Sequence, residues 1–193
     1  ISRIYLLLFI ETMARIFLAL TPEKDLNDEI IDLKKNLKEV LFNDADIIWQ
    51  KNDDHHLTIN FVGPMEPEQI EEMYKGISEI KLLSHLEIEI TSVNFFPHDD
   101  SQLLVSMLKP TPQLQKLFDK VDEVVIRIGF GSSLKNFRPH ITLGRFKDKN
   151  RPQYSLEEFS ELSIKSKVNS IEVYESDFES GRTVYSKLRS FEF

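Results

Sequence analysis

Residues 55–62, HHLTINFV, and residues 139–146, PHITLGRF, repeat one short pattern. Each segment contains His-x-Thr followed by an apolar residue, and the motif residues are His56, Thr58, His140 and Thr142. Side chains alternate along a β-strand, so in each segment the histidine and the threonine share one face and the apolar residues share the other. The repeat therefore predicts two related strands, each presenting an imidazole and a hydroxyl on an exposed face.

Strand-like and helix-like stretches alternate on both sides of these segments. Thr21-Pro22 and Thr111-Pro112 each combine a capping residue with a proline at the first helical position, and apolar residues follow at helical spacing. We therefore expect helices over residues 22–41 and 112–128, a third helix from Pro67, and a short helix over 155–161. Strands are expected over residues 15–20, 55–62, 86–90, 102–108, 139–146, 168–178 and 183–191.

This order of elements predicts an α+β fold. The chain is long enough for one domain, and it contains no linker rich in Gly, Ser or Pro. We expect a single domain over residues 13–193, built as two pseudo-symmetric lobes of mainly antiparallel sheet with outer helices. A pseudo-two-fold axis would bring the two His-x-Thr pairs together across a central cleft.

The first twelve residues have a different character. Their apolar run, residues 4–10, is far shorter than the roughly 20 residues that a membrane-spanning helix needs. Met13-Ala14-Arg15 reads like a natural start directly before a strand. We expect residues 1–12 to be an extension or a misplaced start outside the fold, and the protein to be cytoplasmic and monomeric, without membrane contact.

Composition and charge exclude several classes of function. The 193 residues include no Cys, which excludes disulfides, thiolate metal sites and cysteine nucleophiles. The net charge of −8 argues against an open, non-specific nucleic-acid groove. Positive charge is nevertheless concentrated in residues 127–151. This concentration is suited to binding a small anionic group, and the alternative interpretation is a surface segment exposed to solvent. Its basic residues are Arg127, Lys135, Arg138, Arg145, Lys147, Lys149 and Arg151.

The paired motifs suit phosphodiester hydrolysis without a metal ion. One neutral imidazole can take a proton from water while a protonated imidazole gives a proton to the leaving oxygen, because the ordinary histidine pKa of about 6.5 allows both states. The hydroxyls of Thr58 and Thr142 can donate to phosphoryl oxygens in the transition state. Arg145 follows His140 by five residues, so it shares the face of that histidine only if the strand ends or bulges at Gly144.

Other candidate sites are weaker. His55 and His56 are adjacent and face opposite ways in a strand, so they cannot bind one metal ion together, and we expect no metal and no cofactor. The Gly129–Ser132 loop lacks the Gly-Lys-Ser/Thr of a nucleotide-binding loop and is interpreted as a loop that admits substrate. The Phe95-Phe96 pair is interpreted as core or rim rather than as a base-stacking platform.

Four segments resemble the two-histidine phosphoesterases, and most closely their bacterial and archaeal RNA 2′,3′-cyclic phosphodiesterases, also called 2′-5′ RNA ligases. In order, they are RIFLAL (15–20), HHLTINFVG (55–63), FRPHITLGRF (137–146) and IEVYESDFESGRTVYSKL (171–188). The resemblance implies a bilobal α+β fold with the active site between the lobes. It also implies metal-free hydrolysis of a terminal 2′,3′-cyclic phosphate, with His56 as proton donor, His140 as proton acceptor and Arg145 as a helper.

The same resemblance implies structural roles for three further residues, and at one position the sequence differs from the family pattern. Trp49 and the hairpin residues Gly181 and Tyr185 match framework positions of the family, and His55 stands where relatives often have an apolar residue or another strand residue. The expected partner is an RNA 3′ terminus.

Alternatives remain at this stage. The substrate could instead be a small cyclic nucleotide or an ADP-ribose cyclic phosphate, which the acidic net charge favours. A non-catalytic binder of phosphorylated RNA ends is a third hypothesis, although the intact histidines of both motifs count against it. The residues leave 2′-phosphate and 3′-phosphate products equally open, and only the resemblance favours the 2′-phosphate.

Overall fold

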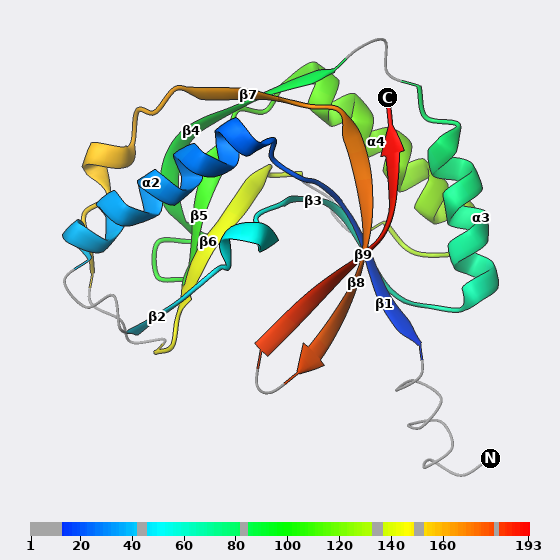
Figure 1. Ribbon diagram of the computed structural model, residues 1–193, viewed down its shortest axis with the longest axis horizontal. Coiled ribbons are helices and arrows are strands. Elements are labelled where there is room, and N and C mark those ends of the chain that lie inside the picture. The colour runs from blue at the N-terminus through cyan, green and yellow to red at the C-terminus, as the bar shows by residue number, and fades with distance from the viewer. Residues whose placement is uncertain (1–12, 42–45, 82–84, 133–136, 149–152, 180–181) are drawn as a thin grey trace.

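A single nine-stranded antiparallel sheet runs through the whole computed structural model (Figure 1). The structure describes residues 13–41, 46–81, 85–132, 137–148, 153–179 and 182–193. The strand order is β7-β4-β5-β6-β3-β1-β8-β9, with β2 paired to β6. The strands are β1 (Ala14–Leu20), β2 (Ile47–Trp49), β3 (Leu57–Met65), β4 (Leu86–Phe96), β5 (Leu103–Leu108), β6 (His140–Phe146), β7 (Ile164–Val168), β8 (Ser170–Glu179) and β9 (Arg182–Glu192).

The sheet consists of two half-sheets with matching strand order, which confirms the predicted bilobal α+β architecture. From the centre outward, one half is β3-β1-β8-β9 and the other is β6-β5-β4-β7. The innermost strands are β3 and β6. β3 pairs with β1, which precedes α2 (Lys24–Val40), and β6 pairs with β5, which precedes α4 (Pro112–Arg127). The two halves are therefore related by an approximate two-fold axis through the β3–β6 pair.

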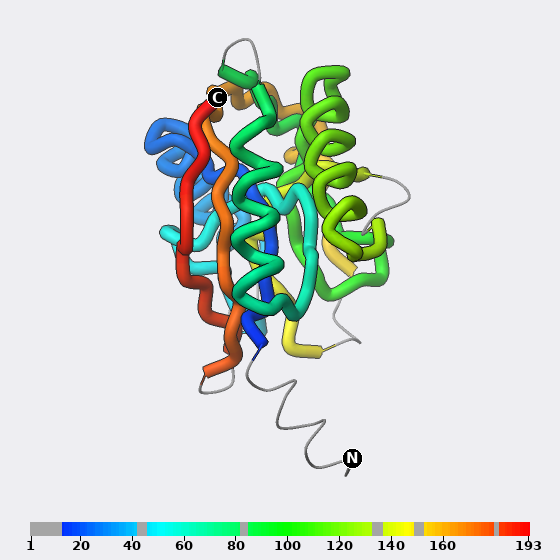
Figure 2. Tube along the Cα trace, turned by 90° about the vertical axis from the view of Figure 1, so that its right-hand side faces the viewer, coloured from blue at the N-terminus to red at the C-terminus, as the bar shows by residue number. Residues whose placement is uncertain are grey.

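Each of these two helices packs against the half-sheet opposite to the one that contains the strand before it. α2 contacts β7, where Ser166 donates to Asp25 at 3.0 Å, and α4 contacts β3, where Asn60 donates to Asp122 at 2.9 Å. The third helix, α3 (Pro67–Ser78), lies side by side with α4 (Figure 2). One buried apolar cluster includes residues from all three helices and from both half-sheets.

The helix boundaries follow local chemistry. Thr111 caps α4 by accepting a hydrogen bond from the Leu114 amide at 3.2 Å. Pro67 opens α3 as predicted, and Glu66 and Gln69 form a reciprocal capping box there. The prediction was wrong at α2, which begins at Lys24 rather than at residue 22 because Glu23 has an extended backbone.

The structure also departs from the sequence prediction in the sheet and at one short helix. β3 continues through Gly63-Pro64 to Met65, because Gly63 adopts a φ of +95° that keeps the chain paired to β1. The strand predicted over 168–178 is β8, whereas β7, at the far edge of the sheet, was not predicted. The helix predicted over 155–161 is only the 3₁₀ turn Glu157–Phe159.

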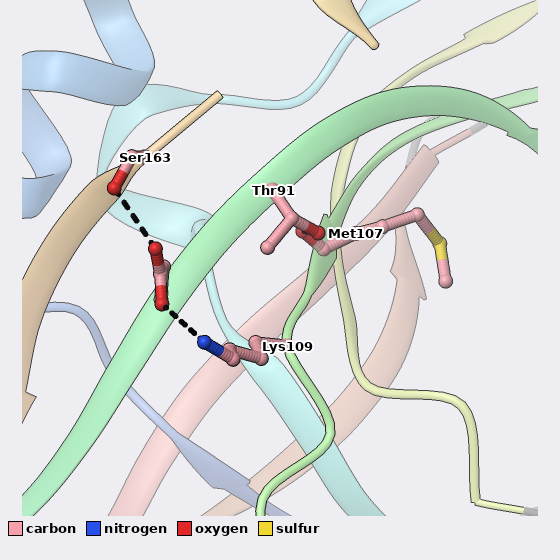
Figure 3. Close-up of polar contacts among 5 residues, drawn as sticks. Thr91, Met107, Lys109 and Ser163 are labelled. Atoms are coloured by element: carbon pink, nitrogen blue, oxygen red, sulfur yellow. Dashed lines mark hydrogen bonds and ion pairs between the residues drawn. The ribbon is translucent and has the colours of Figure 1, made fainter. Parts of the chain in front are cut away.

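Polar side chains join β4 to the chain segments on either side of it (Figure 3). The two carboxylate oxygens of Glu89 accept hydrogen bonds from Ser163 at 2.9 Å and from Lys109 at 3.3 Å, and these bonds lower the pKa of the carboxyl group. The hydroxyl of Thr91 donates to the carbonyl of Met107 at 3.4 Å. These contacts connect β4 to its neighbours, and Met107 in turn pairs with His140 of β6.

Among the helices that the structure describes, none is long and apolar enough to cross a membrane. The predicted extension, residues 1–12, and the turn residue Gly181 lie outside the described residues.

Candidate active site

The two His-x-Thr motifs meet where the two half-sheets join. β3 and β6 are paired through Leu57 and Ile141, the residues between the histidine and the threonine of each motif. Because this pairing is antiparallel, His56 lies toward Thr142 and Thr58 lies toward His140. Leu57 and Ile141 are buried, whereas the four motif side chains are partly exposed. The structure thus places both pairs on one face, as the strand alternation predicted.

Both motif strands contain a bulge at the same place. The pairing of β5 with β6 shifts between Leu104–Gly144 and Val105–Thr142, so Leu143 is an extra residue in β6. The pairing of β1 with β3 shifts in the same way and makes Ile59 the extra residue in β3. A bulge reverses the alternation of the residues after it.

The bulges bring one further residue from each strand onto the face of the motifs. Arg145 is exposed while its neighbours Gly144 and Phe146 are buried, and Phe61 is 45% exposed after the buried Ile59 and Asn60. Both stand five residues after a motif histidine. The sequence predicted that Arg145 shares the face of His140 only if the strand ends or bulges near Gly144. The structure contains that bulge.

His56 is held by a backbone carbonyl and surrounded by rings. Its Nδ1 lies 2.8 Å from the carbonyl oxygen of Asp54, and since a carbonyl only accepts, Nδ1 carries the proton. Phe17 and Tyr185 contact the imidazole with centroids at 5.0 and 5.1 Å, and Tyr174 lies at 6.2 Å. Nε2 is therefore the atom of His56 that is left to exchange a proton.

His140 is held in the same way. Its Nδ1 donates to the carbonyl of Arg138 at 2.7 Å, so Nε2 is again the exchangeable atom. Phe96 stacks on the imidazole with centroids 4.1 Å apart, and the guanidinium of Arg138 covers the same phenyl ring at 4.7 Å. The Arg138 side chain also donates to the carbonyl of Pro97 at 3.1 Å, which fixes the stack.

The environment makes both histidines weaker bases than free histidine. Burial is the largest cause and lowers the pKa of His56 and the pKa of His140. The bonded carbonyls oppose this by stabilising the charged rings, whereas the charge of His140 further lowers the pKa of His56. The two imidazoles are therefore close enough to couple electrostatically.

A pocket of about 320 Å³ opens beside His56 and is largely aromatic on one side. Its lining includes His56, Thr58, Phe61, Phe178 and Tyr185. A second, more open pocket lies on the side of His140, where Phe96 and Arg145 contribute to its lining. Burial and the charge of Asp54 raise the pKa of Tyr185, whereas the charge of Arg145 and a hydrogen bond with Gln50 lower it.

A family model described as the 2′-5′ RNA ligase superfamily matches residues 50–178, which include both motifs. The chain belongs to this superfamily. Two of its similar relatives are named RNA 2′,3′-cyclic phosphodiesterase. The one from Archaeoglobus fulgidus is 26% identical over 92% of this chain and 99% of its own length, and the one from Aeropyrum pernix is 24% identical over 72% and 81%.

Solved structures share the fold of this 2′-5′ RNA ligase superfamily member at low identity. E. coli LigT, crystallised with 3′-AMP, has a TM-score of 0.72 and 21% identity, with 93% of this chain and 98% of that chain covered. Thermus thermophilus TT0787 has a TM-score of 0.79 and 17% identity, with 92% and 97% covered. These similarities confirm the fold class.

Three side chains at the site of this superfamily member were not identified from the sequence. Phe61 could have been found by aligning the two motifs beyond the threonine, where it matches Arg145. Tyr185 was assigned to the framework, but it contacts the His56 ring. Phe96 was placed correctly at a rim, yet its stacking on His140 depends on the pairing of β4 with β5 and of β5 with β6.

Among the described basic residues of 127–151, Arg127 lies apart from Arg138 and Arg145. Arg127 ends α4 and lies 3.8 Å from the carboxylate of Glu79, whereas Arg138 and Arg145 are at the site. Lys135, Lys149 and Arg151 lie outside the described residues. Within the described part of the chain, no three His, Asp or Glu side chains are arranged to hold a metal ion, and His55 faces away from the cleft, 2% exposed.

Proposed function

We propose that the protein hydrolyses 2′,3′-cyclic phosphate termini of RNA, releasing a 2′-phosphate by acid–base catalysis without a metal ion. The observation that carries this proposal is the matched pair of histidines, each with its Nδ1 proton bound to a carbonyl and its Nε2 left for proton exchange. The names of the two relatives from Archaeoglobus and Aeropyrum support the substrate class.

The reaction uses one water molecule and two proton transfers. The neutral Nε2 of His140 takes a proton from water as the water oxygen bonds to phosphorus. The bond from phosphorus to the ribose 3′ oxygen breaks, and the protonated Nε2 of His56 gives its proton to that oxygen. The products are a 2′-phosphate and a 3′ hydroxyl, and the histidines have exchanged protonation states.

The neighbouring groups suit the phosphate. Thr58 and Thr142 supply hydroxyl donors for the non-bridging oxygens, whose charge grows in the transition state. Arg145 adds a positive charge on the same face. The aromatic pocket beside His56 suits the terminal nucleoside, because every nucleobase has a face that stacks on an aromatic ring.

Replacing either histidine tests the proposal. His56→Ala and His140→Ala are each expected to lower kcat by about 10²-fold to 10⁴-fold while the variants remain folded, because positioned proton transfer contributes that much. The substrate is a short oligonucleotide that ends in a 2′,3′-cyclic phosphate. His85→Ala, which removes an exposed histidine elsewhere, is the matched control. Wild-type turnover by either motif variant would contradict the assignment.

Product analysis tests which phosphoester bond breaks, and a chelator tests whether the reaction needs a metal ion. Phosphorus NMR is expected to show a 2′-phosphate, and a 3′-phosphate would mean that the ribose binds the other way round. Activity is expected to persist in EDTA, whereas a loss that a divalent ion restores would indicate metal-assisted hydrolysis instead.

Small cyclic nucleotides are the second candidate substrate. The acidic net charge favours them, and the E. coli structural neighbour was crystallised with 3′-AMP. A kcat/KM for adenosine 2′,3′-cyclic phosphate that exceeds the value for the oligonucleotide would favour this alternative.

A further inference from the structure

A buried lysine lies behind the motif histidine of β3. Lys34 of α2 is 6% exposed, and its ammonium group donates to the carbonyl of Gln50 at 2.6 Å and to Oδ1 of Asn52 at 3.0 Å. Its third contact is Nε2 of His55 at 3.2 Å. All three protons of the ammonium group thus meet neutral partners in one segment, residues 50–55, which leads directly into His56.

His55 completes this cluster as a neutral ring. An ammonium group only donates, so Nε2 of His55 is the acceptor and Nδ1 carries the proton. Nδ1 lies 2.6 Å from Oδ1 of Asn27, also on α2. Burial and the charge of Lys34 lower the pKa of His55 to about 3, which keeps the ring neutral in this arrangement. Both Lys34 and Asn27 therefore bind the 50–55 segment to α2.

The segment passes this support to the carbonyl that holds His56. The Gln50 side chain donates to the carbonyl of Asp54 at 3.3 Å, and the same oxygen accepts from Nδ1 of His56 at 2.8 Å. The backbone N–H of Gln50 donates to the backbone carbonyl of Leu143 at 2.9 Å, which connects the segment to β6, the other motif strand. Lys34 and His56 are thus joined through Gln50 and Asp54.

We propose that Lys34 and His55 are positioning residues for His56, and that they fix its ring by holding the 50–55 segment against α2. This inference rests on the proposed function, because it concerns the support of the proposed acid. His140 has no matching pair in the described structure; its carbonyl partner is held by the Arg138–Phe96 stack.

The chemistry of the pair favours a positioning role over simple stabilisation. Burial, together with the charge of Lys38, lowers the pKa of Lys34 to about 8, which shows that the folded protein disfavours the charge it contains. A buried ammonium group with no anionic partner has a desolvation cost that its hydrogen bonds must offset. The feature that apolar replacements cannot reproduce is the directed set of three hydrogen bonds to one segment.

Three variants test the inference. Lys34→Met is expected to lower kcat about 10-fold to 100-fold with KM within about 2-fold of wild type, because small misplacements of a reacting group have effects of that size. Lys35→Met is the matched control, since Lys35 is exposed on the same helix and pairs with Asp32. Lys34→Met/His55→Leu removes both members of the pair, and we expect it to remain folded yet slow.

A measurement without substrate separates this inference from the proposed function. Nitrogen NMR of the His56 ring is expected to show a firm Nδ1–H tautomer in the wild type and in Lys35→Met, and a mixture of tautomers in both variants that lack Lys34. An unchanged His56 signature in the folded double variant would overturn the inference. Absence of hydrolysis by the wild type, with the NMR change present, would overturn the proposed function alone.

Discussion

His56 and His140 have lowered pKa values for the same physical reason, burial, although they are proposed to act in opposite protonation states. As an acid, His56 is active below its pKa; as a base, His140 is active above its pKa. Both values lie below 6.5, so we expect kcat/KM to be bell-shaped in pH with a maximum below 6.5 and a change of about 10-fold per pH unit on each limb. Rates at subsaturating substrate across pH 4–9 measure this, and a flat profile would contradict it.

Phe61 and Arg145 occupy equivalent positions after the two bulges, and they make the two sides of the cleft different. We expect Phe61→Ala to raise KM for a nucleotide substrate about 5-fold to 100-fold with little change in kcat, because stacking of one base on an aromatic side chain contributes about 1–3 kcal/mol. Ile126→Ala is a control, since Ile126 is similarly exposed on α4. An unchanged KM would place the nucleoside elsewhere.

The motif residues were predictable from the sequence because a His-x-Thr repeat in strand-like segments carries its own geometry. Their side-chain neighbours were less accessible to prediction. Tyr185 reaches His56 from β9, and Phe96 reaches His140 from β4, so both contacts depend on strand pairings between distant parts of the chain. The network through Lys34 likewise joins residues that no local pattern connects.

At the scale of elements, the bulge in β6 is next to a close approach by β2. A Cβ on Gly144 would lie 2.8 Å from Cγ2 of Ile47 and 3.2 Å from the carbonyl oxygen of Ile48. We therefore expect Gly144→Ala to lower the free energy of unfolding by about 1–3 kcal/mol, the usual effect of overpacking. Urea unfolding measures this change.

The same substitution is expected to lower kcat, because β2 or the bulge must move and Arg145 is the next residue. Gly131→Ala is the control, since a Cβ there meets nothing within 4 Å. Equal stability of Gly144→Ala and wild type would show that β2 yields without cost.

The boundaries of the helices and strands show which local sequence signals were sufficient to predict them. The threonine cap of α4 and the proline of α3 were readable because capping chemistry is local. β2 has only three residues and the 3₁₀ turn Asn52–Asp54 is equally short, so neither carries a periodic pattern. β7 was missed because it has only five residues, and a single residue, Asn169, separates it from β8, which pairs with different partners.

At the scale of the whole molecule, buried neutral histidines make stability depend on pH. Between pH 6.5 and about 3, His55 binds a proton in the unfolded chain but not in the folded protein, so the free energy of unfolding falls as the pH falls through this range. The full contribution is on the order of 5 kcal/mol for a shift of this size. His56 and His140 act in the same direction.

Replacing His55 isolates its part of this effect. We expect the free energy of unfolding of His55→Leu to depend less steeply on pH between 6.5 and 3 than that of the wild type, whatever the two values are at neutral pH. Urea unfolding at half-unit pH intervals measures both slopes. Equal slopes would mean that His55 is protonated in the folded protein.

The order of strands in the sheet also differs from their order of synthesis. β1 and β3 leave the ribosome early, but their half-sheet is completed only by β8 and β9, which are translated last among the described elements. Until then β1 has an unpaired edge, and His56 lacks the rings of Tyr174 and Tyr185. A nascent chain that stalls between residues 147 and 169 therefore has both histidine motifs but lacks β8 and β9, so such partial translation products carry His56 without two of its ring neighbours.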